Sequence, residues 1–218
     1  MLDAAALRRL VAAGETDRVE FKRKVAHPLK VAREAVAFAN SGGGVLLIGV
    51  EDNRTLPGLK DPDGDEFLLD RALALACRPQ VPHRRYRVPI TDETWVLVYE
   101  IAEGPDKPYA LLEEDTETVY VRVQDRALQA SRELRQILRQ QKKDKALRYE
   151  FGDKERQLVA AIEARGAITL ADFAALAQVP ERQASRTLVL LVLAGLLEIV
   201  PAVGGDLFKI KEKGEEIA

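Results

Sequence analysis

The sequence predicts an α+β fold in two domains: a larger domain that mixes helices with strands, and a smaller helical domain that ends in a hairpin. The apolar segment VLLIGV (45–50) has the pattern of a central strand and lies among both helical and alternating patterns. Three helical patterns then precede a hairpin signal at Gly204-Gly205. A chain of 218 residues also exceeds what one small core needs. We expect a first domain at 1–141, a polar linker at 142–152 and a second domain at 153–218.

Apolar periodicity defines the elements of the first domain. In order, they are a helix at 2–13, a strand at 18–24, a helix at 27–40, the strand 45–50, a helix at 67–77, strands at 84–90, 94–102 and 118–123, and a helix at 131–141. Both faces of 45–50 are apolar, so we expect cover on both sides. Alternation in the first strand sets Glu20 opposite Val19 and Phe21, which predicts that Glu20 faces water or a ligand.

Two segments resemble ligand-binding loops but are interpreted otherwise. The triple glycine at 42–44 follows a helix and precedes a strand, the reverse of the order in a P-loop, so it is predicted to end the helix. The segment DPDGDEF (61–67) lacks the glycine position and the final glutamate of a calcium loop, and is predicted to be a turn.

The second domain is predicted from three helices and two strands. DKERQLVAAIEA (153–164) is followed by Gly166, TLADFAALAQ (169–178) has Thr169 as its cap, and PERQASRTLVLLVLAGL (180–196) begins at Pro180. A short second helix that turns tightly into a third, followed by a hairpin, is typical of a winged helix-turn-helix.

Composition excludes several classes of function. The single cysteine, Cys77, rules out an internal disulfide and a multi-cysteine zinc site, and no apolar run is long enough to span a membrane. We therefore expect a cytoplasmic protein with no membrane partner. Only two histidines occur and no serine lies in a nucleophile-elbow context, so a serine or cysteine triad is not expected. A formal net charge of −2 gives no global attraction to nucleic acid, so any such binding depends on local clusters.

Carboxylates near the first two strands are candidate metal ligands. Glu15 precedes the first strand, Glu20 lies within it, and Asp52 follows the apolar strand. Carboxylates are the ligands that Mg²⁺ or Mn²⁺ accepts, and a bound cation neutralises phosphate and activates water. The alternative is that these are surface carboxylates and turn caps, with no cofactor.

Basic side chains are candidate contacts to nucleic acid. In the first domain they are Lys22, Lys24, Arg84, Arg85 and Arg87. In the second, the start of the third helix presents Arg182, Gln183 and Arg186 to a major groove. Two alternatives stay open: a solvated basic strand, and a winged helix that dimerises through the apolar continuation LVLLVLAGLL (188–197).

Four segments together resemble the Schlafen-type, AlbA-type nucleic-acid-binding domain over about residues 8–140: GETDRVEFKRK, AVAFANSGGGVLLIGVEDN, KPYALL and TVYVRVQDRALQASRE. The resemblance implies an α+β fold, bacterial members of regulator type, and often an appended winged helix. In the nuclease members, the metal-binding acids fall on Glu15, Glu20 and Asp52. The family commonly has a glycine after its YVRV strand, where this chain has Gln124-Asp125.

The expected function is therefore nucleic-acid binding of a regulatory type, as in a transcriptional regulator, with DNA or RNA as partner and a homodimer as the assembly. The first alternative is a metal-dependent endoribonuclease acting on structured RNA such as transfer RNA, with Glu15, Glu20 and Asp52 as catalytic acids and Lys22 steadying the phosphate. The second is a dimeric interaction scaffold.

Overall fold

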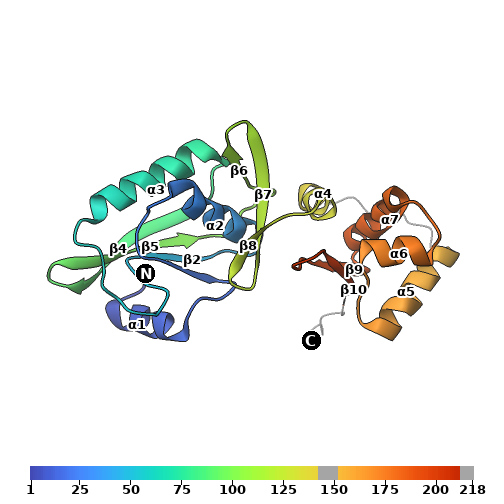
Figure 1. The fold of residues 1–218 in the computed structure, drawn as a ribbon, viewed down its shortest axis with the longest axis horizontal. Helices are drawn as coiled ribbons and strands as arrows, with labels where there is room; N and C mark the ends of the chain where they lie inside the picture. Colours follow the sequence, from blue (N-terminus) through green and yellow to red (C-terminus); the bar gives the residue numbers. More distant parts are fainter. Residues whose placement is uncertain (142–151, 212–218) are drawn as a thin grey trace, which may run out of the picture. The chain divides into compact units, whose positions relative to one another are not determined.

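The structure is a computed structural model that describes residues 1–141 and 152–211. The chain forms two compact units, Met1–Gln129 and Ala130–Ala218 (Figure 1). The helix expected at 131–141, at the end of the first domain, lies in the second unit. The expected linker at 142–152 lies outside the described residues, Gly152 excepted.

A four-stranded mixed sheet forms the centre of the first unit. Its strands are β1 (Val19–Lys22), β2 (Gly44–Ile48), β5 (Thr94–Ile101) and β4 (His83–Thr91), in that order. β1 and β2 are parallel, and the other pairs are antiparallel. A second sheet, wholly antiparallel, has the order β3 (Cys77–Arg78), β6 (Ala110–Glu113), β7 (Thr116–Val123) and β8 (Arg126–Gln129).

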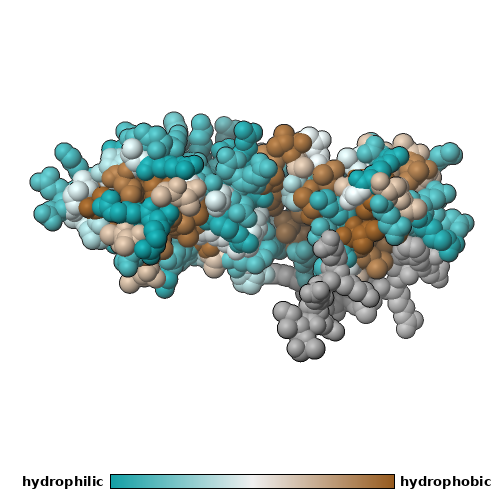
Figure 2. Space-filling model, turned by 90° about the horizontal axis from the view of Figure 1, so that it is seen from below, coloured by the Kyte–Doolittle hydropathy of each residue, from teal (hydrophilic) through white to brown (hydrophobic). Residues whose placement is uncertain are grey.

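Helices cover both faces of the first sheet, as expected for the apolar strand β2. α1 (Ala4–Ala13) packs Leu7 and Val11 on one face, in a core that includes Leu47 of β2. α2 (Pro28–Asn40) and α3 (Pro62–Ala76) lie on the other face, in a core that includes Leu46 and Ile48. α2 also packs against β6, β7 and β8, so it lies between the two sheets (Figure 1). The side of the first unit on which α1 lies presents hydrophilic and hydrophobic residues interspersed (Figure 2).

Local sequence explains where two of these helices begin and end. α2 ends at the triple glycine, as predicted, because Gly42 and Gly43 adopt φ of 91° and 83°. A β-carbon on Gly44 would lie 2.3 Å from the Phe38 ring, so only glycine fits there. The turn predicted at 61–67 is wrong, because α3 already begins at Pro62, with the Asp61 side chain accepting a hydrogen bond from the Asp63 amide.

The second unit contains four helices and a hairpin within its described residues. They are α4 (Arg132–Gln140), α5 (Asp153–Arg165), α6 (Leu170–Leu176), α7 (Glu181–Leu193), β9 (Leu197–Val200) and β10 (Leu207–Ile210). Gly166, Thr169 and Pro180 occupy the predicted terminal positions of α5, α6 and α7. One apolar core joins α5, α6, α7 and both strands, and α4 packs against α7.

Within residues 1–141 and 152–211, no helix is both long enough and apolar enough to cross a membrane.

Candidate functional site

The three carboxylates selected from the sequence lie around β1 and β2. Glu15 is in the loop before β1, Glu20 is within β1, and Asp52 is in the turn after β2. Glu15 Oε1 accepts a hydrogen bond from the Phe21 amide at 2.8 Å. Burial raises the pKa of Glu15, and the charges of Glu20 and Asp52 raise it further, whereas the Phe21 amide and Lys22 lower it. The fold therefore brings these acids and Lys22 into one neighbourhood.

Glu20 does not face water, contrary to the alternation in its strand. Its Cα pairs in register with Leu46, whose side chain lies in the core beneath α2, so the polar face of β1 is covered. Only 6% of Glu20 is exposed. Its Oε1 pairs with the Lys22 ammonium, and its Oε2 accepts a hydrogen bond from Arg122 at 3.1 Å. Both carboxylate oxygens are thus engaged by cations.

Arg122 of β7 is the centre of a buried ion-pair cluster, and its side chain is 1% exposed. One guanidinium nitrogen donates to Glu20 and also to Glu34 of α2, the latter at 2.7 Å. The other donates to the Thr16 carbonyl at 2.9 Å, and the guanidinium lies 4.6 Å from the centre of the Phe38 ring. Arg122 therefore ties the second sheet to α2, to β1 and to the loop before β1.

Glu34 adds a second buried carboxylate to this cluster. Burial raises its pKa and the charge of Glu20 raises it further, while Arg122, Arg33 and Lys22 lower it. Arg33 approaches Glu34 at 3.5 Å. Ionised carboxylates are tolerated here because cations of the same chain surround them.

These donors do not fit a divalent cation as they stand. A hard cation needs carboxylate oxygens that are free to coordinate it, and both oxygens of Glu20 are taken. In the described part of the chain, no three His, Cys, Asp or Glu side chains gather in a metal-binding arrangement. Lys22 and Arg122 supply the positive charge that a metal ion would bring.

An open pocket of about 580 Å³ lies beside Glu15 and is lined in addition by Thr16, Asp17, Gln124 and Asp125. Three of its five side chains are acidic, so it repels phosphate. Gln124, where the family resemblance implies a glycine, has a φ of 56°, in the left-handed region that favours glycine. The backbone at Gln124 thus adopts the conformation that a glycine would favour, although this residue carries a side chain.

The predicted basic strand is neutralised within the first unit. Its three arginines lie on β4 opposite carboxylates of β5 and α3. The ion pairs are Arg84 with Glu100, Arg85 with Asp70 and Glu66, and Arg87 with Asp63 and Glu66. Lys22 is paired with Glu20, whereas Lys24 is exposed and has no partner among the described residues. Of the five cations predicted to grip phosphate in this domain, four are engaged.

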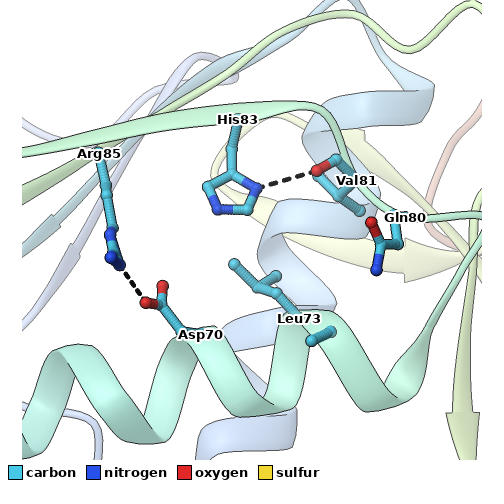
Figure 3. A pocket seen from close by; sticks show the side chains of 7 residues that line it. Asp70, Leu73, Gln80, Val81, His83 and Arg85 are labelled. Atoms are coloured by element: carbon cyan, nitrogen blue, oxygen red, sulfur yellow. Dashed lines mark hydrogen bonds and ion pairs between the residues drawn. The ribbon is translucent and has the colours of Figure 1, made fainter.

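A smaller pocket of about 310 Å³ lies between α3 and the start of β4 (Figure 3). The Asp70 carboxylate reaches Arg85 on one side and accepts a hydrogen bond from the Tyr99 hydroxyl at 3.0 Å on the other. His83 lies 2.9 Å from the Val81 carbonyl through Nδ1. The charged groups of this pocket are therefore satisfied by one another.

In the second unit, Arg182, Gln183 and Arg186 lie together at the start of α7, as predicted, and all three are exposed. They line a groove of about 520 Å³ with Arg132 and Gln136 of α4. The side chains of Arg132, Arg182 and Arg186 form no ion pair or hydrogen bond with another described residue. This unpaired state contrasts with the arginines of β4.

The sequence interpretation missed Arg122, Glu34, Arg132 and Gln136. Glu34 interrupts the apolar helix pattern KVAREAVAFA, and Arg122 interrupts the valines of TVYVRV, so each could have been flagged as a buried charge that needs a partner. No local signal places α4 against α7.

The chain shows likeness to known proteins in its sequence family and among solved structures. Curated protein sequences gave no match. Among the solved structures that match, two illustrate a partial likeness. The solution structure of the N-terminal domain of an ATP-dependent DNA helicase RecG-related protein from Nitrosomonas europaea is 25% identical, with a TM-score of 0.45 over 56% of this chain and 88% of that one. A crystal structure of a protein from Corynebacterium diphtheriae is 18% identical, with a TM-score of 0.45 over 95% of this chain and 38% of that one.

The sequence profile described as "Schlafen, AlbA_2" matches residues 15–131, which is more than half of the chain. This range includes the neighbourhood of Glu15, Glu20 and Asp52 and the buried Arg122. The chain belongs to the Schlafen AlbA_2 family.

Proposed function

We propose that this protein is a nucleic-acid-binding regulator whose second unit is a winged helix-turn-helix that binds duplex DNA through α7. The observation that carries the proposal is the exposed set Arg182, Gln183 and Arg186 at the start of α7, whose side chains have no partner in the part of the chain that the structure describes. Bidentate contacts from arginine and glutamine are the commonest means of reading base edges in a major groove. Family membership supports a role connected with nucleic acid.

The proposal places the main contacts in the second unit because the cations of β4 are already neutralised. An arginine that is paired with a carboxylate must break that ion pair before it can bind phosphate. The loss of the ion pair offsets part of the binding free energy of the phosphate contact. Arg182 and Arg186 have no such partner in the described residues, so their binding energy is fully available.

Binding of labelled duplex DNA to the full chain tests this proposal. The double variant Arg182→Ala/Arg186→Ala is expected to lose about thirtyfold or more in affinity, since two contacts of about 1–3 kcal/mol each are removed. The matched control, Arg84→Ala/Arg85→Ala, removes the same charge from paired sites and is expected to bind within about threefold of the wild type. The opposite ranking would move the binding surface to the first unit.

A metal-dependent endoribonuclease is the second candidate, favoured by the common neighbourhood of Glu15, Glu20, Asp52 and Lys22. It requires that a cation displace Lys22 or Arg122 from Glu20. Incubation of transfer RNA with the protein and manganese tests it, with the exposed Asp52→Ala as the variant that least disturbs the fold. Cleavage by the wild type and not by the variant would favour this candidate, whereas intact RNA with both would remove it.

A homodimer built on α7 is the third candidate. Within the second unit, Leu188, Val189 and Leu191 are already buried, which leaves little apolar surface on α7 for a second copy. Light scattering at micromolar concentration measures the assembly directly. A monomer under those conditions would rule out the scaffold.

A further inference from the structure

We propose that the groove between α4 and the start of α7 holds the sugar-phosphate backbone of a DNA duplex, with Arg132 of α4 as a phosphate contact. This inference rests on the proposed function of α7 and extends it to a helix outside the three-helix winged domain. It assigns α4 a role in binding beside the helix that we propose for base contacts.

The chemistry of the groove suits a phosphodiester. Its volume of about 520 Å³ is lined by three arginines and two glutamines and by no carboxylate. Guanidinium groups bind phosphate oxygens bidentately, and glutamine amides donate to them as well. A neighbouring pocket of the same unit is different in kind, since Glu133, Glu181 and Asp206 contribute to its lining.

The arginines of the groove are free to bind a ligand. Arg132, Arg182 and Arg186 are exposed, and none pairs with another described residue. Three like charges converge on one groove without a counter-ion among residues 1–141 and 152–211, which is unfavourable unless an anion completes the site. In the first unit, by contrast, the arginines of β4 each have carboxylate partners.

α4 is held in place, so Arg132 is presented at a fixed position. Ser185 of α7 donates a hydrogen bond to Glu133 of α4 at 2.5 Å. Ser131 caps α4 by accepting from the Leu134 amide at 3.0 Å, and its hydroxyl donates to Asp206, next to β10. The apolar side of α4, with Leu134, Ile137 and Leu138, is buried. A side chain carried by a helix that is already ordered loses less entropy on binding than one on a segment that must first fold.

Helix geometry indicates that α4 contacts the backbone and not the bases. The major groove is about 12 Å wide and admits one helix. The axes of packed helices lie about 8–10 Å apart, so α4 cannot enter the major groove beside α7. It lies instead over the DNA strand that borders the major groove. Arg132 and Gln136 then contact phosphate, whereas Gln183 and Arg186 face the base edges.

Salt dependence of DNA binding tests the inference with the full chain and a labelled random-sequence duplex of about 30 base pairs. Loss of one phosphate contact lowers the slope of log K against log salt by about 0.9. For Arg132→Ala, the affinity lost between about 50 and 200 mM salt should therefore be about 3.5-fold smaller than for the wild type. Arg132→Lys keeps the charge and should retain the wild-type slope.

Arg139→Ala is the matched control, because Arg139 is an exposed arginine of the same helix that does not line the groove. It should retain the wild-type slope. If Arg132→Ala also keeps the wild-type slope while Arg182→Ala lowers it, the inference is wrong and the proposed function stands. If the wild type does not bind duplex DNA, both are wrong.

Discussion

Substitution of Arg122 by methionine should strongly destabilise the first unit. The change removes a guanidinium that is 1% exposed and leaves Glu20 and Glu34 as buried carboxylates without their shared donor. Two charge-assisted hydrogen bonds of about 1.5–3 kcal/mol each are lost. Removal of one partner from a buried ion pair costs about 3–5 kcal/mol in general. Both routes give an expected loss of about 4 kcal/mol in the free energy of unfolding.

Urea unfolding followed by tryptophan fluorescence measures this loss. Trp95 is the only tryptophan and lies in β5, so its emission reports the first unit. With a slope of about 2 kcal/mol per molar urea, the midpoint should fall by about 2 M. The loss should also be smaller at pH 5 than at pH 7.5, because burial raises the pKa of Glu34 and its protonation removes an unpaired buried charge.

Arg85→Met is the control for a general effect of losing an arginine. Arg85 pairs with Asp70 and Glu66, but 43% of its side chain is exposed, so the expected cost is about 0–1 kcal/mol. A loss below about 1 kcal/mol for Arg122→Met, or an equal loss for both variants, would refute the view that the buried cluster holds the two sheets together.

Three further changes test individual features of the first unit. Asn40→Ala removes a buried amide that donates to the Tyr109 carbonyl and accepts from the Tyr109 amide, both at 2.8 Å, and should lower the free energy of unfolding by about 2 kcal/mol or more in urea titrations. Glu34→Gln removes a carboxyl whose pKa is raised in the folded protein. In the wild type, the stability that depends on this raised pKa is lost as the pH rises from the ordinary pKa of glutamate through the raised pKa of the folded state. The variant should therefore show a shallower decline over that range, by at most about 1.4 kcal/mol per pH unit. Gln124→Gly should raise the midpoint of thermal unfolding, because it removes the backbone strain of about 1 kcal/mol that a left-handed glutamine carries. An unchanged or lower midpoint would show that the glutamine side chain compensates for this strain.

Elements with a regular apolar pattern and a recognisable cap could be predicted from the sequence. α5, α6 and α7 follow from helical periodicity between Gly166, Thr169 and Pro180, because each terminus carries the residue type that its backbone requires. The start of α3 was missed because Asp61-Pro62 suits both a turn and a helix N-terminus. The short strands β6 and β8 carry too few residues for a period of two to be evident.

The charged residues were harder to interpret because pairing depends on tertiary contacts. The alternation of polar and apolar residues in β1 correctly places Glu20 on the opposite face of the sheet from Phe21. It does not reveal that α2 covers the face on which Glu20 lies. The arginines of β4 looked like a phosphate-binding stretch in isolation. Asp63, Glu66 and Asp70 recur at helical spacing on α3 and meet those arginines across the fold, which identifies the stretch as an internal ion-pair network.

The apolar surplus of α7 shows how a missed contact changes a functional interpretation. From the sequence, LVLLVLAGLL carries more apolar residues than one core uses, which suggested a dimer interface. In the structure, Leu188 and Leu191 lie in the core with α5 and α6, and α4 packs against α7. Val189 is buried but lies outside that core, on the same side of α7 as Ser185, which bonds to α4. A second helix of the same chain thus accounts for the surplus, and its arginine adds a cation beside the face that we propose for DNA.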